Sequence, residues 1–225
     1  MNEDYVDPYG RFARYYDRVL NPVLDPVRGS VALQLETLQT ASVLDVCCGT
    51  ARQAAFLPAP VTRYVGVDAS DAMLRAGALA LSLEAAGSAP SEVRYAGTRR
   101  GRAAIELLCT DGQALPFAEK SFDAALIAFA LHEKPLEEAF TVAREALRVA
   151  TSLVIVDYTM PERTIECPAA LLMHLPERIA GGEHYRHFRA FMRAGGLQGF
   201  AYALGLKEKA RQRLFYGGAA IAVYD

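Results

Sequence analysis

The stretch that decides the fold is Val43–Ala51, VLDVCCGTA, in which a continuous apolar run ends in a turn of small residues. Three further runs have the same character: Tyr64–Val67 (YVGV), Asp123–Ala130 (DAALIAFA) and Leu153–Asp157 (LVIVD). Continuous apolar runs, unlike alternating ones, are typical of parallel strands that helices cover on both faces. The first run, Ser42–Cys47, is therefore predicted to be a buried strand of an α/β sheet.

The segments between these runs favour helices. Ser70–Ala86 begins with capping residues and continues with strong helix formers, while Pro135–Val149 has proline in its first turn and apolar residues at helical spacing. Ala104–Thr110 adds a core strand, and Gly199–Leu206 and Gly218–Tyr224, joined by a charged linker, resemble a terminal antiparallel pair. The prediction is an α/β fold with a Rossmann-like, doubly wound sheet of seven strands, mostly parallel, with one antiparallel strand near the C-terminus.

Composition narrows the class of protein. With 225 residues, of which 52% are hydrophobic, the chain can bury a full core, and we expect one domain over residues 1–225 with an inserted loop or hairpin at 87–103. The net charge of −2 gives no general attraction to nucleic acid, so we expect no nucleic-acid partner. The four cysteines lack the spacing of a zinc knuckle or a disulfide framework, and the apolar stretches are too short to span a bilayer. These features favour a cytoplasmic protein.

Small and acidic residues follow the predicted strands at the points where the strands end. The small-residue turn Cys47–Ala51 allows backbone amides to approach a ligand closely. Asp68 closes the second strand, where a carboxylate can accept both hydroxyls of a ribose. Asp111 and Gly112 follow the third core strand, and an acidic side chain there can accept a hydrogen bond from an adenine amino group. Asp45 lies within the first strand, where the alternative role is that of a turn or capping aspartate.

Three segments together resemble the signature segments of class I S-adenosylmethionine-dependent methyltransferases: Val43–Ala51, Val65–Leu74 (VGVDASDAML) and Asp111–Glu133 (DGQALPFAEKSFDAALIAFALHE). The similarity is strongest to the group that contains the ubiquinone and menaquinone methyltransferases and bacterial phosphatidylethanolamine N-methyltransferases. Phe12–Asp17 (FARYYD) is similar to the N-terminal helix of that group, and Gly182–Gly196 (GEHYRHFRAFMRAGG) is similar to a late segment. The resemblance implies a methyltransferase with S-adenosylmethionine as its cofactor.

The resemblance also implies which residues bind the cofactor. Asp45 and the backbone after it would line the methionine part, Asp68 would hold the ribose hydroxyls, and Asp111 would meet the adenine edge. Aromatic residues of an N-terminal helical lid, about residues 1–40, would help to close the pocket. The implied cofactor-binding residues are Tyr16, Asp45, Cys47, Cys48, Gly49, Asp68, Ala69, Met73, Asp111, Gly112 and Ala128.

The sequence departs from the family pattern in the turn after the first strand. The family usually has glycines at the positions of Cys47, Gly49 and Ala51, and only Gly49 is a glycine here. Ala51 adds one methyl group where close packing is expected. Cys47 and Cys48 are interpreted as small packing residues in preference to nucleophiles, because no neighbouring group in the sequence would lower a thiol pKa.

The acceptor is expected to be small and hydrophobic or lipid-like, such as a quinone-type ring or a phospholipid amine, with peripheral membrane contact as a further expectation. His132 follows the fourth core strand, where it can act as a general base, orient the acceptor or line the pocket. His184 and Tyr185 are candidate acceptor contacts from the late segment. No pair of histidines at close spacing stands beside a carboxylate partner, so no metal site is predicted.

Two other functions fit parts of the same pattern. A dinucleotide-dependent oxidoreductase also uses a glycine turn and a ribose carboxylate, but the second and third glycines of its motif are missing here. A non-catalytic protein that binds S-adenosylmethionine as a scaffold is compatible with the altered glycine turn. Transfer of a labelled methyl group would separate these alternatives.

Overall fold

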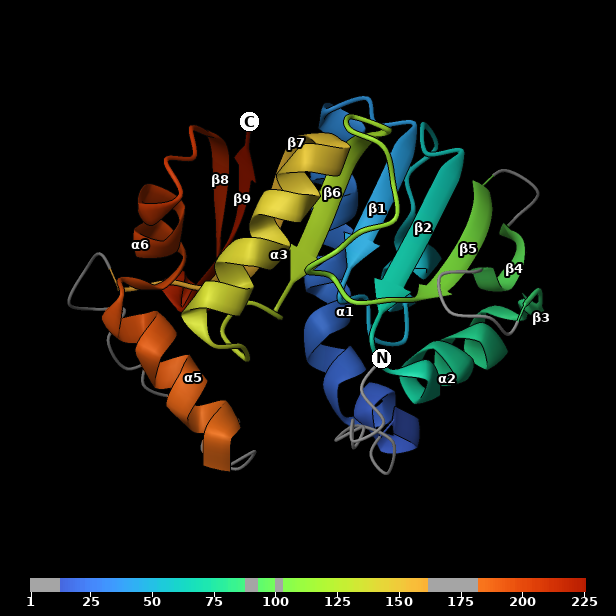
Figure 1. Cartoon of the computed structure of the whole chain (residues 1–225), viewed down its shortest axis with the longest axis horizontal. Helices are drawn as coiled ribbons and strands as arrows, with labels where there is room; N and C mark the ends of the chain where they lie inside the picture. The colour runs from blue at the N-terminus through green and yellow to red at the C-terminus, as the bar shows by residue number, and fades with distance from the viewer. Residues whose placement is uncertain (1–12, 88–92, 100–102, 162–181) are drawn as a thin grey trace. The chain divides into compact units, whose positions relative to one another are not determined.

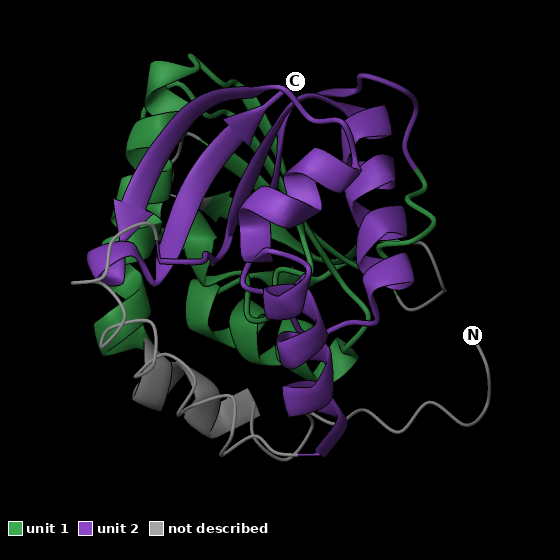
Figure 2. Cartoon of the chain, turned by 90° about the vertical axis from the view of Figure 1, so that its left-hand side faces the viewer, with its two compact units in different colours: residues 1–116 green, residues 117–225 purple. Residues whose placement is uncertain are grey.

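The computed structural model describes residues 13–87, 93–99, 103–161 and 182–225, and it resolves the chain into two compact units. The first unit comprises residues 1–116 and the second residues 117–225, drawn in green and purple in Figure 2. Each unit contains both strands and helices (Figure 1).

The first unit holds five strands in the order β3-β4-β5-β2-β1. The strands β1, β2 and β5 run parallel to one another, while β4 is antiparallel to both of its neighbours. A doubly wound arrangement of this kind brings the carboxyl ends of β1, β2 and β5 to the same sheet edge. The elements in chain order are α1 (Ala13–Thr37), β1 (Ser42–Val46), η1 (Arg52–Phe56), β2 (Arg63–Asp68), α2 (Asp71–Leu81), β3 (Glu84–Ala85), β4 (Val93–Arg99) and β5 (Ala103–Cys109).

The second unit holds four strands in the order β6-β7-β9-β8. The strands β6 and β7 are parallel, and β9 is antiparallel to both β7 and β8, so β9 is the reversed strand of this unit. Helix α3 packs on β6 and β7. The elements are β6 (Phe122–Ala128), α3 (Leu136–Val149), β7 (Ala150–Tyr158), α5 (Gly182–Arg193), α6 (Gly196–Ala203), β8 (Glu208–Leu214), η3 (Phe215–Gly217) and β9 (Ala219–Tyr224).

The expected α/β fold with mostly parallel strands and a reversed strand near the C-terminus is confirmed, but the strand count is corrected. The described residues form nine strands instead of seven, and β4 is a second reversed strand. The additional strands are β3 and β4, which pair with each other. Alternation in the predicted insert at 87–103 was too weak to show that its residues 93–99 would pair with residues 103–108 of β5.

The prediction of a strand at Gly199–Leu206 is wrong, because Gly196–Ala203 forms helix α6. Its buried side chains, Leu197, Phe200 and Ala201, recur at i, i+3 and i+4, which is helical spacing. The segment interpreted as a charged linker is strand β8 instead. Its charged residues are tolerated because β8 pairs with β9 as the last strand of its sheet order, and charges are typical of edge strands.

Local sequence accounts for the bounds of the helix that follows β2. Helix α2 begins after Ser70, whose hydroxyl accepts a hydrogen bond from the Met73 amide at 3.2 Å. It ends at Leu81, earlier than the predicted Ala86, because Ser82 adopts a left-handed conformation that reverses the chain into β3. The N-terminal capping residues were therefore easier to recognise than the C-terminal end.

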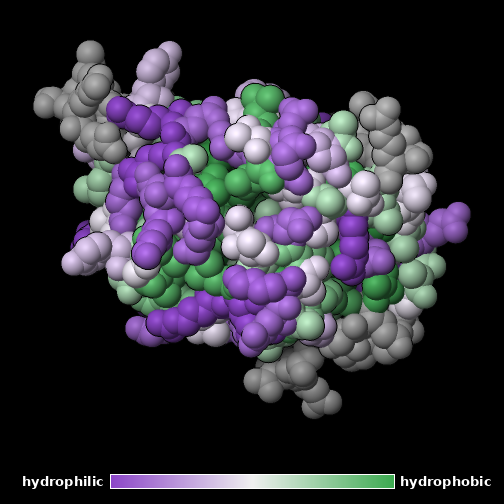
Figure 3. Space-filling view, turned by 90° about the horizontal axis from the view of Figure 1, so that it is seen from above, coloured by the Kyte–Doolittle hydropathy of each residue, from purple (hydrophilic) through white to green (hydrophobic). Residues whose placement is uncertain are grey.

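Surface and core follow the usual division in each unit. The core is aliphatic and aromatic, with Leu44, Tyr64, Leu126 and Ile155 fully buried. Hydrophilic and hydrophobic residues interleave on the face seen in Figure 3. Among the described residues, none of the helices combines the length and the apolar character needed to cross a bilayer.

Candidate functional site

The loop after β1 has an unusual backbone. Cys47, Gly49 and Ala51 all adopt left-handed conformations, with φ of 58°, 57° and 50°. Glycine adopts this conformation without strain, whereas another L-residue there costs about 1–2 kcal/mol. The loop thus keeps the backbone path that three glycines would take, although two of the three are replaced. Strain that persists in this way is typical of functional loops.

Asp68 ties this loop to the start of α2. Its Oδ2 accepts a hydrogen bond from the Gly49 amide at 2.8 Å, and its Oδ1 accepts one from the Ser70 amide at 2.9 Å. A carboxylate offers about four lone-pair sites, so two backbone amides use only part of its capacity as an acceptor. The Met73 side chain lies over the same loop, since a Cβ added at Gly49 would meet Met73 Cε at 3.3 Å. Gly49, Asp68 and Met73, all predicted site residues, are therefore neighbours.

Asp45 lies beneath the loop and is buried, with 4% of its surface exposed. Its Oδ2 accepts a hydrogen bond from the Tyr64 hydroxyl at 2.5 Å. Burial, with a smaller contribution from the Asp68 charge, raises the pKa of Asp45 to about 7, against the lowering effects of the Tyr64 hydrogen bond and the Arg28 charge. Such displaced pKa values concentrate at functional sites. Tyr64 was not predicted, because an aromatic residue at the start of a buried strand has no local signal of this contact.

The Cys48 thiol lies in a setting that disfavours its ionisation. Burial, as the largest cause, raises the pKa of Cys48 well above its ordinary value, with the Asp45 carboxylate adding to the effect. The Cys48 thiol is therefore protonated and unsuited to act as a nucleophile. Its sulfur packs close to β2, because a Cβ at Gly66 would lie 2.9 Å from it. The packing role that the sequence suggested for Cys48 agrees with this position.

Helix α2 approaches the β1 loop through a glycine that the sequence reading did not single out. A Cβ at Gly77 would lie 2.2 Å from the backbone oxygen of Thr50, closer than any side chain can be placed. Gly77 thus lets the helix rest directly on the loop that carries Gly49. The signal available in the sequence was a glycine inside an otherwise strong helix former, which often marks close packing.

Asp111 and Gly112 lie in the loop after β5. Asp111 is exposed, and its Oδ1 accepts a hydrogen bond from the Gln113 amide at 2.9 Å, as in an ordinary Asx turn. Gly112 is buried, and Ala69, after β2, is exposed. The roles of these three residues at the adenine edge stay predictions.

In the second unit, His132 is held by a partner that the sequence reading missed. His132 is 2% exposed, and its Nδ1 donates to Asp157 Oδ1 at 2.7 Å. Asp157, fully buried at the end of β7, also accepts a hydrogen bond from the Tyr158 amide at 2.7 Å. An acidic residue that closes a predicted strand was the same signal that identified Asp68, so Asp157 could have been found in this way.

Helix α5 brings its predicted residues to the same place. The His184 and His132 rings meet edge to face, with centroids 5.9 Å apart, and Tyr185 stacks on Phe188 at 6.1 Å. Phe188 and Phe191 are fully buried, as the helical spacing suggested. His132, His184 and Tyr185 are therefore members of one aromatic cluster within the second unit.

Some predictions fall at the limits of the described residues. Tyr16 lies in α1, but its side chain is outside the described part, as is Phe12. The inserted segment is described only at residue 87 and as β4, because 88–92 and 100–102 lie outside the described residues. Ala128 is the last residue of β6, and its contact with the cofactor stays a prediction. In the proposed lid, Val31 and Leu35 of α1 are buried.

Comparisons with known proteins agree with this geometry. Residues 44–154 match the family of the methyltransferase domain. No curated protein sequence matches the chain.

Three solved structures show the same fold. Magnesium protoporphyrin IX methyltransferase from Synechocystis, with bound S-adenosylhomocysteine, is 16% identical over 99% of this chain and 89% of that one, with a TM-score of 0.59. The N-methyltransferase NodS from Bradyrhizobium japonicum, in complex with S-adenosylhomocysteine, is 13% identical over 90% and 87%, with a TM-score of 0.57. The PH0226 protein from Pyrococcus horikoshii is 18% identical over 100% and 99%, with a TM-score of 0.59.

The first unit fits the cofactor that this family uses. Its loop keeps the left-handed backbone that glycines would adopt at Cys47, Gly49 and Ala51, and Asp68 places an acidic acceptor beside that loop. The family match spans the strands and loops that carry both features. Together with the match of residues 44–154 to a methyltransferase domain, these features identify the chain as an S-adenosylmethionine-dependent methyltransferase, with S-adenosylmethionine as its cofactor.

Proposed function

We propose that this chain methylates a small hydrophobic or lipid-like acceptor, such as a quinone-type ring or a phospholipid amine. The observation that supports this proposal is the His132–Asp157 pair, which is surrounded by aromatic rings. A histidine held by a buried carboxylate is suited to act on an acceptor proton, and the rings around it favour an apolar acceptor.

The residues of the first unit would hold the cofactor, as the resemblance implies. Asp68 would accept the ribose hydroxyls, the backbone around Gly49 would approach the methionine part, and Met73 would lie beside the adenine. Bound S-adenosylmethionine supplies an activated methyl group on a sulfonium, which leaves by an in-line displacement. Once ionised, Asp45 would add negative charge beneath the methionine part, where the cofactor carries positive charge.

The acceptor would be recognised by the second unit. Tyr158 and Phe188 form a buried cluster, against which the partly buried rings of Phe129 and Tyr185 pack. Planar apolar groups pack favourably against such rings, edge to face or offset. His184 and Tyr185 lie on α5 beside the cluster and would contact the acceptor.

His132 would act through its second ring nitrogen. Because Nδ1 donates to Asp157, the tautomer is fixed with a lone pair on Nε2. This lone pair can accept a proton from an acceptor hydroxyl or bind a cation that polarises the hydroxyl, and both help an oxygen acceptor to react. An amine acceptor needs only its neutral form.

The test is transfer of a labelled methyl group to a panel of acceptors. The full chain is incubated with S-adenosylmethionine labelled in the methyl group, together with a reduced prenylated quinone, phosphatidylethanolamine vesicles or water-soluble phenols and amines. We expect label in the quinol or the lipid, and a loss of about a hundredfold in kcat with an oxygen acceptor for His132→Gln. Labelling confined to a charged water-soluble acceptor, or to none while S-adenosylhomocysteine binds, would contradict the proposal.

The lipid in this panel also tests membrane contact. If the acceptor is a phospholipid, the chain must reach a bilayer surface, and it should co-sediment with phosphatidylethanolamine vesicles in the presence of S-adenosylhomocysteine. If the chain methylates a dispersed quinol but does not bind vesicles, the quinone-type acceptor is supported and the phospholipid amine is excluded.

A further inference from the structure

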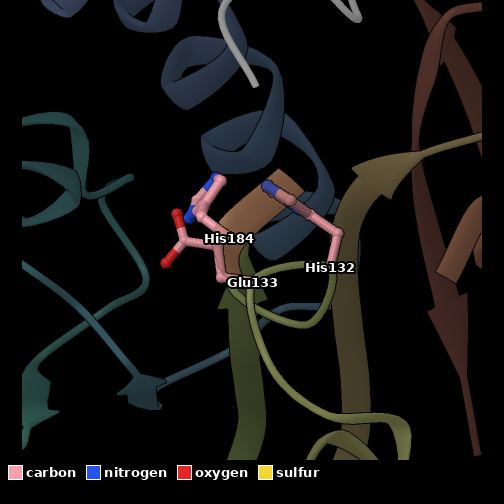
Figure 4. A group of neighbouring side chains, drawn as sticks. All are labelled: His132, Glu133 and His184. Atoms are coloured by element: carbon pink, nitrogen blue, oxygen red, sulfur yellow. The ribbon is translucent and has the colours of Figure 1, made fainter. Parts of the chain in front are cut away.

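We propose that His132, Glu133 and His184 form a binding site for a divalent transition metal of the zinc class. One ligand atom from each residue can be chosen so that all three atoms lie within 4.8 Å of one another. Figure 4 shows the three side chains converging, with His132 and Glu133 from the loop after β6 and His184 from α5. The two histidines are far apart in sequence, so no short metal motif announces them.

The buried carboxylate of Asp157 gives His132 the orientation of a metal ligand. Histidines that bind metals generally donate their other ring N–H to a carboxylate or a carbonyl, which fixes the tautomer and raises the basicity of the ligating nitrogen. His132 does so through Nδ1 to Asp157 at 2.7 Å, which leaves Nε2 as the nitrogen to bind the metal. Asp157 is fully buried, and its Oδ2 accepts no hydrogen bond from the described residues. A cation on the His132 ring would therefore also stabilise this carboxylate.

The other two ligands are positioned by contacts within the second unit. His187 donates from Nδ1 to the backbone oxygen of Glu133 at 2.9 Å, which joins α5 to the loop that carries Glu133. Phe188, on the same helix, packs edge to face on both His132 and Tyr158. These contacts fix the helix on which His184 stands, one turn from His187 and Phe188. The backbone that presents the ligands is thus already ordered by other interactions.

The ligand set indicates the class of metal and the state of its coordination sphere. Two imidazoles and one carboxylate suit Zn²⁺, and also Fe²⁺, Co²⁺ and Mn²⁺, better than they suit Ca²⁺. With bonds of about 2.0–2.2 Å, ligand atoms around tetrahedral Zn²⁺ are about 3.3 Å apart, whereas these three lie within 4.8 Å of one another, so the site must contract by at most about 1.5 Å. Rotation of the Glu133 and His184 side chains, both only partly buried, can supply that movement. Three protein ligands leave a position for water or for an acceptor oxygen.

This position deepens the proposed function, on which its catalytic use rests. A hydroxyl bound to Zn²⁺ has a lowered pKa, so an oxygen acceptor would release its proton to water without needing a protein base. His132 would then serve the acceptor through the metal. Metal binding itself does not depend on methyl transfer and can be measured separately.

The experiment measures Zn²⁺ binding to the full chain without an affinity tag that contains histidine. Protein freed of metal with EDTA is titrated with Zn²⁺ by calorimetry, and the titration is repeated with Co²⁺ by absorption. We expect the chain to bind one equivalent of Zn²⁺. With Co²⁺ we expect absorption bands typical of a metal ion with a low coordination number, and no strong charge-transfer band from a cysteine thiolate. Glu133→Gln and His184→Ala should each weaken Zn²⁺ binding at least tenfold.

Two control variants test whether the effect belongs to these ligands. His187→Asn removes a histidine from the same helix but keeps a donor at the position of Nδ1 for the Glu133 carbonyl, and Glu183→Gln removes the carboxylate that pairs with Arg186 at 2.7 Å. Both should bind Zn²⁺ within about threefold of the unaltered chain. Circular dichroism without metal confirms that all four variants fold, which is expected because the four positions are partly or fully exposed.

The outcomes separate the metal site from the methyl-transfer proposal. Three results would overturn the metal site, whatever the activity. They are no Zn²⁺ binding by the unaltered chain, binding by Glu133→Gln and His184→Ala as tight as that of the unaltered chain, or a charge-transfer band from a cysteine thiolate. Zn²⁺ binding that behaves as expected in a chain that labels no apolar acceptor would overturn only the proposed function. Activity lost with EDTA and restored by Zn²⁺ would support both.

Discussion

Replacement of Asp45 by asparagine should stabilise the protein, and more so as the pH rises. The carboxylate is buried, with 4% of its surface exposed, and burial raises its pKa to about 7 from 3.8. The Tyr64 hydroxyl and Arg28 act in the opposite direction without overcoming burial. Asparagine has nearly the same shape, and its side-chain oxygen can still accept the Tyr64 hydrogen bond, so the change removes the charge and little else.

The sign follows from proton binding in the two states. Between pH 3.8 and about 7, folded Asp45 holds a proton that the unfolded chain has released, so the free energy of unfolding falls as the pH rises through this window. The destabilisation is absent below pH 3.8, the pKa of the unfolded chain, and is fully present above about pH 7, the pKa of the folded chain. The difference between the two pKa values corresponds to about 4 kcal/mol at full ionisation. Between pH 5 and pH 8, linkage predicts a change of about 2–3 kcal/mol.

Urea unfolding of the ligand-free chain at pH 5 and pH 8 measures this change. The free energy of unfolding of Asp45→Asn minus that of the unaltered chain should be about 2–3 kcal/mol larger at pH 8 than at pH 5. The matched control is Asp71→Asn, which removes the carboxylate of a partly exposed ion pair with Arg75 at 2.9 Å instead of a buried carboxylate. If the difference in free energy of unfolding between Asp45→Asn and the unaltered chain is the same at pH 5 and pH 8, or is smaller at pH 8, ionisation of the buried carboxyl group does not destabilise the folded chain as predicted.

The remaining predictions concern the cofactor loop. Asp68→Ala should weaken S-adenosylhomocysteine binding by about 2–4 kcal/mol in calorimetry, because the carboxylate that would hold the ribose also accepts the Gly49 and Ser70 amides; unchanged affinity would remove Asp68 from the site. Gly77→Ala should lower the free energy of unfolding by about 1–3 kcal/mol and weaken cofactor binding, since its Cβ would lie 2.2 Å from the Thr50 oxygen. The control is Gly29→Ala in α1, where an added Cβ would have no atom within 4 Å, and it should stabilise the chain by about 0.5–1 kcal/mol. Equal changes in the free energy of unfolding at the two glycines would refute the packing argument.

Local sequence determined most of the strands, most of the helices and the positions of the acidic residues. Continuous apolar runs such as Leu153–Asp157 must be covered on both faces, which requires a parallel α/β sheet. Because parallel strands end at one edge, Asp68 could be placed beside the turn of Gly49 without coordinates, and the structure joins the two by a hydrogen bond. The family resemblance then supplied the cofactor, which the match of residues 44–154 supports.

Short apolar segments near the C-terminus were beyond this reasoning. Gly196–Ala203 is a helix and not a strand, because a run of eight residues carries too little periodicity to separate the two states. The choice is made by packing: Phe200 stacks on Phe140 of α3 with ring centroids 4.8 Å apart. The charged residues of Glu208–Leu214 could form β8 because β9 supplied a partner for the backbone.

Only the tertiary structure decided the contacts between residues that are distant in sequence. Asp45 meets Tyr64 across neighbouring strands, and His132 meets Asp157 and His184 from three separate elements. Periodicity and motifs report which face of an element is buried, whereas these pairs depend on register, side-chain direction and the docking of α5. The pKa of Asp45 and the convergence of His132, Glu133 and His184 follow from burial and proximity, which exist only after the chain has folded.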